Sequence, residues 1–248
     1  MAEDYKSYYD QIAPNFDCLR LDRTNEIETT LRIIRQFVEP KDGFVLDIGC
    51  GTGRYASPLS KSGYVVVGID KSINQLRHAK NIPLTACASA ENLPFGDNLF
   101  SACLVILVLH QLDRHARTAL FREANRTLKG EGKVILKTCS HKDLSKRPFT
   151  SYFPSGLKIN LTRYPDISEL AEGMKSGGFH NVQVLHTYSE EILDKQDVLS
   201  SIRQKHNTTL ALIPTLEFEE GCVEMERAFA KEDEICVPHH HTIVIADK

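Results

Sequence analysis

Three glycines at alternate positions follow an apolar run in the first quarter of the chain. The run Phe44–Ile48 ends in Gly49, and Gly51 and Gly53 come next, before a helical stretch. Glycines after a buried strand permit a tight turn and let a ligand approach the backbone closely. A dinucleotide fingerprint needs the spacing G-x-G-x-x-G, whereas here the third glycine of that pattern is replaced by Arg54. The glycines indicate a ligand-binding turn, and the neighbouring residues must decide which ligand it takes.

Two acids flank this turn at the ends of predicted strands. Asp47 lies two residues before the first glycine, and Asp70 ends the second apolar run. A carboxylate at Asp47 can face a cationic amino group and suits a pyrophosphate poorly. Asp70 has the position from which a carboxylate accepts hydrogen bonds from both hydroxyls of a ribose. Together the two acids predict a ligand that is a nucleoside carrying an amino acid. The alternative is a plain turn in which Asp70 caps the next helix.

Alternating apolar runs and helical patterns must position these residues. Amphipathic patterns predict helices over Thr24–Val38 and Asp113–Leu128. Continuous apolar runs are typical of strands buried on both faces, as in a parallel sheet. We therefore predict an α/β fold with a doubly wound, mostly parallel seven-stranded sheet and helices on both faces. The predicted strands are Phe44–Ile48, Val65–Ile69, Leu84–Cys87, Ala102–Leu109, Val134–Leu136, Val182–Leu185 and His241–Ile245.

The composition is that of an ordinary globular protein. The chain has 248 residues, 42% of them hydrophobic and 25% charged, with a formal net charge of −3. This balance offers no basic surface for nucleic acid, so no nucleic-acid partner is expected. We predict a single domain over residues 1–248. It comprises an N-terminal helical part (1–40), a cofactor-binding core (41–140) and a substrate-side segment (141–248), with a helical insertion (189–236) before the final strand.

The sequence also predicts a cytoplasmic location without membrane association. Its seven cysteines are scattered and include no C-x-x-C pair, which favours reduced thiols over a disulfide framework. The first ten residues are polar, unlike a signal peptide. The longest apolar run, Ala102–Leu109, is too short to span a bilayer.

With these motifs the chain resembles the class I S-adenosylmethionine-dependent methyltransferases, the broad group that includes ubiquinone and menaquinone methyltransferases. The resemblance covers about residues 1–140 with specific motifs and the remainder loosely. It implies S-adenosylmethionine as cofactor, S-adenosylhomocysteine as product and a small-molecule methyl acceptor. It also implies that Ala88–Phe95 is an adenine-binding stretch, with Ser89 where the family often has an acid, and that Tyr5–Phe16 folds over the cofactor as a lid. The cofactor residues so implied are Tyr9, Asp47, Gly49, Cys50, Gly51, Gly53, Asp70, Lys71, Ser89, Ala90, Glu91 and Leu107.

The sequence gives weaker evidence for the residues that would contact the methyl acceptor. His110 follows the fourth predicted strand and is the best candidate for a general base, because its ordinary pKa suits proton transfer near neutrality. A purely structural role is the alternative, and His141 is a weaker candidate. Phe149, Tyr152 and Phe153 could line an apolar acceptor pocket or plug a gap in the core. The run of histidines at 239–241 predicts a surface strand, and we expect no metal site.

Other functions compete with methyl transfer to a small molecule. The same cofactor could support cyclisation or aminocarboxypropyl transfer, and the acceptor could be a protein or an RNA. The lack of a basic excess counts against RNA. A dinucleotide-dependent oxidoreductase is disfavoured by the glycine spacing and by Asp47.

Overall fold

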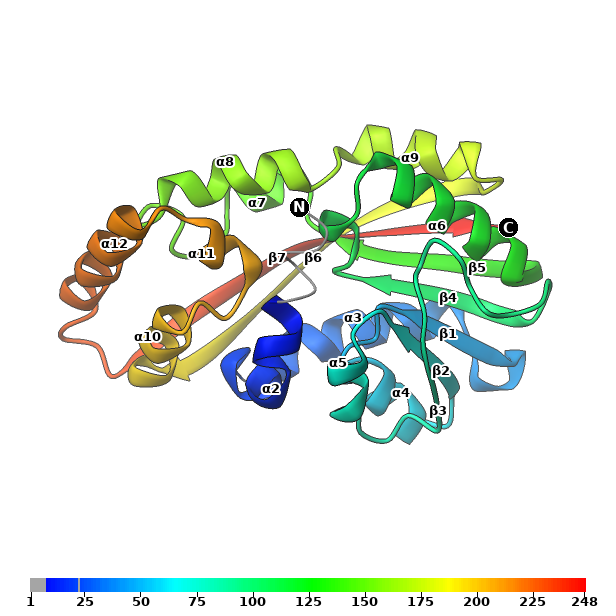
Figure 1. The fold of residues 1–248 in the computed structure, drawn as a ribbon, viewed down its shortest axis with the longest axis horizontal. Coiled ribbons are helices and arrows are strands. Elements are labelled where there is room, and N and C mark those ends of the chain that lie inside the picture. The colour runs from blue at the N-terminus through cyan, green and yellow to red at the C-terminus, as the bar shows by residue number, and fades with distance from the viewer. Residues whose placement is uncertain (1–7, 22) are drawn as a thin grey trace.

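A seven-stranded sheet with helices on both faces forms the centre of the molecule (Figure 1). The computed structural model describes residues 8–21 and 23–248. The first five strands run parallel, whereas β7 is antiparallel to both of its neighbours, so the predicted fold class is confirmed. Across the sheet the strands are β3 (Leu84–Cys87), β2 (Val65–Asp70), β1 (Phe44–Ile48), β4 (Phe100–Ile106), β5 (Leu128–Thr138), β7 (Glu234–Asp247) and β6 (His180–Asp194).

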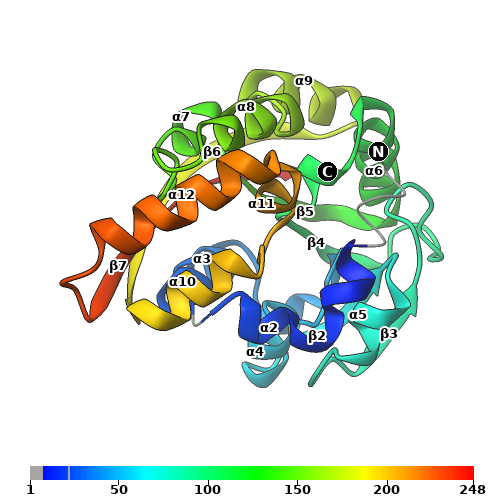
Figure 2. The same ribbon diagram turned by 60° about the vertical axis from the view of Figure 1, so that its left-hand side comes forward.

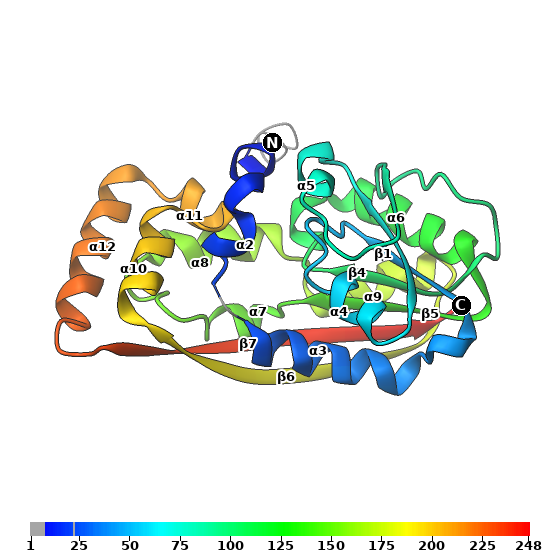
Figure 3. The same cartoon turned by 90° about the horizontal axis from the view of Figure 1, so that it is seen from below.

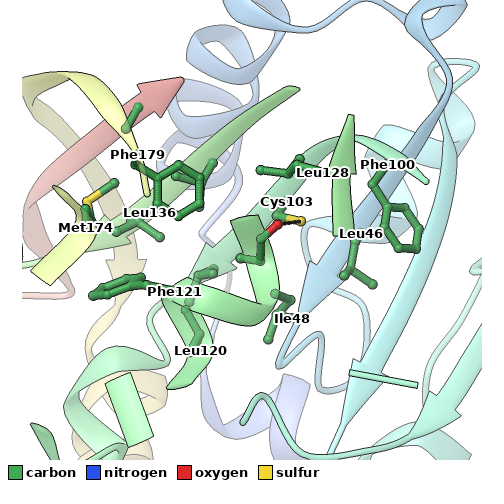
Figure 4. Close-up of a cluster of buried hydrophobic side chains, with 14 of the residues drawn as sticks. Leu46, Ile48, Phe100, Cys103, Leu120, Phe121, Leu128, Leu136, Met174 and Phe179 are labelled. Carbon is green, nitrogen blue, oxygen red and sulfur yellow. Dashed lines mark hydrogen bonds between the residues drawn. The ribbon is translucent and has the colours of Figure 1, made fainter. Parts of the chain in front are cut away.

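Each central strand is apolar on both sides because helices cover both faces of the sheet. In β1, Leu46 and Ile48 pack into one hydrophobic cluster (Figure 4), and Val45 packs into the cluster on the opposite face. This double burial explains why the strands read as continuous apolar runs. Two helices contribute to each cluster. They are α6 (Arg114–Thr127) and α9 (Ile167–Ser176) on the first face, and α3 (Thr24–Phe37) and α4 (Ala56–Lys61) on the second.

Local signals fix the ends of the long helices. The Asp113 side chain accepts a hydrogen bond of 2.8 Å from the backbone N–H of Ala116 and thereby caps α6. Helix α3 ends at Phe37, just before Pro40 opens the 3₁₀ turn η2 (Pro40–Asp42). Two short helical segments follow strands on the cofactor side of the sheet. These are α5 (Ile73–Arg77) after β2 and η3 (Leu109–Gln111) after β4.

The last two strands are much longer than predicted. β6 and β7 stay paired from His180 with Asp247 to Asp194 with Glu234, whereas β7 pairs with β5 only from Thr242 onward. Their distal halves therefore form a two-stranded ribbon beyond the sheet (Figure 3). The predicted insertion at 189–236 is wrong at its edges, because its first and last residues belong to the ribbon. An apolar run detects only the part of a strand that is buried on both faces, and the ribbon is covered on one.

A second hydrophobic core lies at the end of this ribbon. Phe153, Ile202 and Met225 are among its buried members, together with Ile235 and Val237 from the buried face of β7. Helices that lie on one side of the ribbon form the rest of this part of the molecule (Figure 2 and Figure 3). They are α7 (His141–Leu144), α8 (Pro154–Arg163), α10 (Lys195–Arg203), α11 (Thr208–Leu212) and α12 (Thr215–Ala228).

The N-terminal leader lies between the two cores. Residues 8–12 are helical, and η1 (Ala13–Asn15) and α2 (Phe16–Leu19) follow. Tyr5, the first residue of the predicted lid, lies outside the described residues. In the described part of the chain, no helix has both the length and the apolar character needed to cross a bilayer.

Candidate active site

The glycine loop after β1 has the backbone that its composition predicts. Gly49, Gly51 and Gly53 all have positive φ, at 78°, 55° and 87°. A Cβ on Gly49 would lie 2.5 Å from Val108 Cγ2, and one on Gly53 would lie 2.7 Å from Ile82 Cδ1. The backbone N–H of Gly49 donates to the Ile69 carbonyl at 2.8 Å and so ties the loop to β2. Only glycine satisfies both constraints at the first and third positions.

Asp70 holds the loop from the end of β2. Its two carboxylate oxygens accept one backbone N–H each, from Gly51 at 2.9 Å and from Ser72 at 2.8 Å. Burial raises the pKa of Asp70, although these two donors oppose the shift. The cap of α5 is Ser72, whose hydroxyl accepts the N–H of Gln75. Each Asp70 oxygen keeps acceptor capacity for a further donor, as a ribose hydroxyl would supply.

Asp47 is a buried carboxylate without a compensating donor. Its side chain is 2% exposed. We find no hydrogen bond to it from the residues that the structure describes. Burial and then the negative charge of Asp70 raise the pKa of Asp47 to about 7. A buried group in this state favours a cationic partner, because a nearby positive charge offsets the cost of ionising it.

These elements enclose a cavity of about 470 Å³, which we call the cofactor cavity. Eleven of the twelve predicted cofactor residues line it, from Tyr9 in the leader to Ser89, Ala90 and Glu91 after β3. The exception is Gly53, which packs under Ile82 and shapes the turn instead. The roles of these residues toward a cofactor stay predictions.

The leader closes over this cavity. The Tyr9 hydroxyl accepts a hydrogen bond from Gln111 at 2.9 Å, and its carbonyl oxygen accepts one from Gln75 at 3.0 Å. Ser72 donates to Asp10 at 2.5 Å. These contacts hold the described part of the predicted lid against the cavity, which Tyr9 and Phe16 line, and its action as a lid stays a prediction.

Several lining residues escaped sequence reasoning because they come from distant segments. Glu26 forms a buried ion pair with Lys137 and accepts a hydrogen bond from Tyr55 at 2.7 Å. Arg20 and Arg23, from the leader and the turn before α3, also reach the cavity. Basic residues in a helical leader are ordinary surface features in a sequence, so no local signal distinguishes these.

A second, smaller cavity adjoins the first. It measures about 180 Å³, and we call it the acceptor cavity. Arg20, Arg23 and Leu107 line both cavities and therefore mark their junction. Leu107 has φ 57°, in the left-handed region that non-glycine residues seldom adopt, and its N–H donates to the Lys137 carbonyl at 2.9 Å. Strain of this kind is typical of functional sites.

Comparison with known proteins decides the family. A model described as "Methyltransferase domain" matches residues 46–136. The chain is 32% identical over 212 residues to an uncharacterised protein of Methanocaldococcus jannaschii, covering 75% of this chain and 79% of that protein. It is 35% identical over 132 residues to a demethylmenaquinone methyltransferase of Corynebacterium kroppenstedtii, covering 52% and 56%. The chain belongs to the class I S-adenosylmethionine-dependent methyltransferases.

A solved structure supports the same fold. A protein of Anabaena variabilis, described as a putative methyltransferase from an antibiotic biosynthesis pathway, superposes on this methyltransferase with a TM-score of 0.66. The two chains share 21% identity, and the match covers 87% of this chain and 95% of the other.

The histidines of this methyltransferase differ in where they lie. His110 lines the acceptor cavity and stacks on Tyr164, with ring centroids 4.5 Å apart. Burial, followed by the positive charges of Arg163, Arg147 and Arg20, lowers the pKa of His110 well below its ordinary range. The lowered pKa favours the neutral imidazole at pH 7 and makes it a weak base. Its catalytic role stays a prediction.

The predicted strand at 239–241 is confirmed as part of β7, but its predicted place on the surface is wrong. His239 and His241 are 7% and 6% exposed and point from β7 into the acceptor cavity. Burial and then the charge of Arg23 lower the pKa of His239 to about 3. The reason for the error is that helices far along the chain cover this face of the ribbon. Among the described residues no three His, Cys, Asp or Glu side chains are grouped to hold a metal ion.

The remaining candidates divide between the cavity and its surroundings. Phe149 and Phe153 line the acceptor cavity, whereas Tyr152 packs against Phe229 behind it. His141 lies outside, with its Nε2 3.0 Å from the Tyr164 carbonyl oxygen.

Proposed function

We propose that this methyltransferase binds S-adenosylmethionine in the cofactor cavity and transfers its methyl group to a small molecule in the acceptor cavity. One observation carries the proposal. The cavity at the ends of β1, β2 and β4, which contains Asp47 and Asp70, adjoins a second cavity whose described lining residues include no acid. A volume of about 470 Å³ lies within the range of pockets that bind ligands of this size.

The residues present fit the charges of the cofactor. Asp47 would face the amino group and the sulfonium side of the methionine part, which would compensate its buried charge. Asp70 would accept the ribose hydroxyls with the capacity that Gly51 and Ser72 leave free. Ser89 and Glu91, which line the same cavity, would meet the adenine. When bound, the cofactor supplies an electrophilic methyl group.

The residues of the chain would position the acceptor and exclude water from the junction of the two cavities. The leader, fastened through Tyr9 and Asp10, covers the cofactor cavity and keeps water from the junction. Leu107 and the side chains around it hold the acceptor against the methyl group, because the two cavities meet there. Such alignment requires the reacting atoms about 3–3.5 Å apart.

Analysis of the reaction products tests this function. The purified protein is incubated with S-adenosylmethionine and a panel of small metabolites, and the mixture is examined by mass spectrometry. We expect S-adenosylhomocysteine together with an acceptor that is heavier by one methylene. Formation of methylthioadenosine, or of an isomerised acceptor without S-adenosylhomocysteine, would assign other chemistry to the site. Methylation of added protein or RNA alone would overturn the small-molecule acceptor.

A further inference from the structure

We propose that the methyl acceptor is a small carboxylic acid with a compact apolar body and that its carboxylate is the group that is methylated. The inference rests on the proposed function and names its substrate class. It follows from the charge, the unpaired polar atoms and the size of the acceptor cavity.

The acceptor cavity is strongly cationic. The guanidinium groups of Arg20, Arg23 and Arg147 line it. Among the described residues that form its wall, none is an aspartate or a glutamate. These three arginines also form no ion pair with a carboxylate in the part of the chain that the structure describes. Burial and then the positive charges of Arg20 and Arg54 lower the pKa of Arg23 to about 9.

The cofactor does not neutralise this charge. S-adenosylmethionine carries one carboxylate, and Arg54 lines the cofactor cavity alone. Arg23 also reaches that cavity and could share the same carboxylate. Arg147 lines the acceptor cavity alone, where Tyr164 holds it by a hydrogen bond of 2.8 Å. At least one guanidinium therefore remains for an anion on the acceptor, and Arg20 at the junction places that anion beside the methyl group.

Three buried polar atoms in the wall of the acceptor cavity lack a hydrogen-bond partner. They are Arg20 Nε, His110 Nδ1 and His239 Nε2, all without a partner among the described residues. Buried polar groups in folded proteins are nearly always paired, so several orphans around one cavity indicate a polar ligand. Arg20 Nε is a donor, and the neutral imidazoles can each turn an N–H toward an acceptor. Donors of this kind favour an acceptor group such as a carboxylate over a cationic group on the ligand.

Apolar side chains form one part of the wall, and the cavity is small. Phe149, Phe153, Leu157 and Ile213 contribute to its wall. Its volume of about 180 Å³ compares with the roughly 150 Å³ of an engineered cavity that binds benzene. One ring or a short branched chain has the size to fill this space.

The chemistry balances without a base. A lone pair on the ionised carboxylate oxygen forms a bond to the methyl carbon, and the carbon–sulfur bond breaks with its electron pair passing to sulfur. The cation and the anion become a neutral thioether, S-adenosylhomocysteine, and a neutral methyl ester. Because the acid is already ionised near neutrality, no proton must be removed. His110 then orients the carboxylate by donating a hydrogen bond rather than by accepting a proton.

Calorimetric titration of the protein saturated with S-adenosylhomocysteine tests the proposal. The probes are benzoate, phenylacetate and 3-methylbutanoate, each beside its uncharged amide, with phenyl phosphate as a competing anion. We expect at least one acid to bind about tenfold or more tightly than its amide, and S-adenosylmethionine to convert that acid to its methyl ester. Arg20→Gln should weaken acid binding about tenfold, Arg20→Lys should restore part of it, and Arg227→Gln on the exposed face of α12 should change it less than about twofold.

The outcomes distinguish a failure of the proposed function from a failure of the carboxylate assignment. If S-adenosylhomocysteine itself fails to bind, the proposed function is wrong. If it binds but no acid binds better than its amide, the carboxylate assignment alone is wrong. Stronger binding of phenyl phosphate than of every carboxylate would likewise overturn it, as would an Arg20→Gln protein that still folds and binds the acids as tightly as the natural chain.

Discussion

The two adjoining cavities of this methyltransferase differ in charge and origin: the first has acids as well as basic residues in its wall, and the second has basic residues and no acid among its described lining residues. The cofactor cavity is built on consecutive strand ends, and its acids Asp47 and Asp70 lie on either side of one glycine loop. The acceptor cavity has arginines and histidines and no acid among its described lining residues, and its wall comes from the leader, α8, α10 and the ribbon. A cavity that contains the buried acids Asp47 and Asp70 therefore meets a cavity without acids among its described lining residues at Leu107.

This difference explains how one fold can keep its cofactor and change its acceptor. Close contacts restrict two positions of the glycine loop to glycine, since Gly49 and Gly53 have no room for a Cβ. The acceptor cavity depends on which helices the ribbon carries, and these pack in a core of their own. Substitutions in one cavity should therefore leave the other nearly unchanged.

The largest effect is expected at Gly49. Gly49→Ala places a Cβ 2.5 Å from Val108 Cγ2 at a φ of 78°, so the loop must shift. We expect S-adenosylmethionine affinity to fall by about 100-fold or more and stability to fall by about 2 kcal/mol, measured by calorimetry and thermal unfolding. Gly96→Ala is the matched control, because no atom lies within 4 Å of its Cβ. Equal behaviour of the two variants would contradict this account of the loop.

Asp47 should couple cofactor binding to pH. Its pKa of about 7 means that binding a cation requires loss of a proton at lower pH, so the affinity should fall up to about tenfold per unit below pH 7 and level off above it. Asp47→Asn should flatten this dependence and weaken binding about 10–100-fold at pH 8.

The same substitution should stabilise the protein without cofactor. A carboxyl pKa raised by burial destabilises the folded state increasingly as pH rises from the unfolded pKa near 4 to the folded pKa near 7. Asp47→Asn should remove this penalty, for which the shift sets an upper bound of about 4 kcal/mol at pH 8. Asp197→Asn on exposed α10 is the control, with little change expected in either thermal unfolding or binding. A destabilised Asp47→Asn protein would speak against a strained, unpaired carboxylate.

Substitution at His239 should affect the acceptor cavity alone. His239→Leu removes a buried ring nitrogen that has no partner among the described residues, so folding stability should be unchanged or slightly higher. We expect kcat/KM for the acceptor to fall about 3–10-fold while S-adenosylhomocysteine affinity stays within about twofold. His78→Leu provides an exposed control. An equal loss of cofactor affinity would show that the cavities are not independent.

The smallest effect is expected in the leader. Tyr9→Phe removes the acceptor of the Gln111 amide and should raise the cofactor dissociation constant about 2–5-fold. Tyr188→Phe removes a hydroxyl from a ring that is 55% exposed and should have no effect. If both variants bind equally well in calorimetry, the leader does not hold the cofactor through this contact.

Sequence reasoning reached the cofactor cavity because its information is local. One strand–loop–helix–strand unit contains the glycines, Asp47 and Asp70, and parallel strands must place their ends together. Ser89 to Glu91 follow from the next strand by the same rule. The close contact under Gly53 was invisible, because it depends on Ile82 meeting the loop in space.

The acceptor cavity was predicted only in part, through His110, Phe149 and Phe153, for the opposite reason. Arg20, His110, Arg147 and His239 come from four separate segments, and only the folded chain brings them together. His239 seemed to lie on a surface strand because alternation along β7 does not tell which face the helices cover. The same ambiguity hid the true length of the ribbon.

Calorimetric titration of the natural chain at pH 8 with S-adenosylmethionine, S-adenosylhomocysteine and NAD tests the central claim most directly. The account predicts saturable 1:1 binding of both adenosyl compounds, with proton release on binding of S-adenosylmethionine near pH 7, and no binding of NAD. Saturable binding of NAD without binding of either adenosyl compound would contradict it.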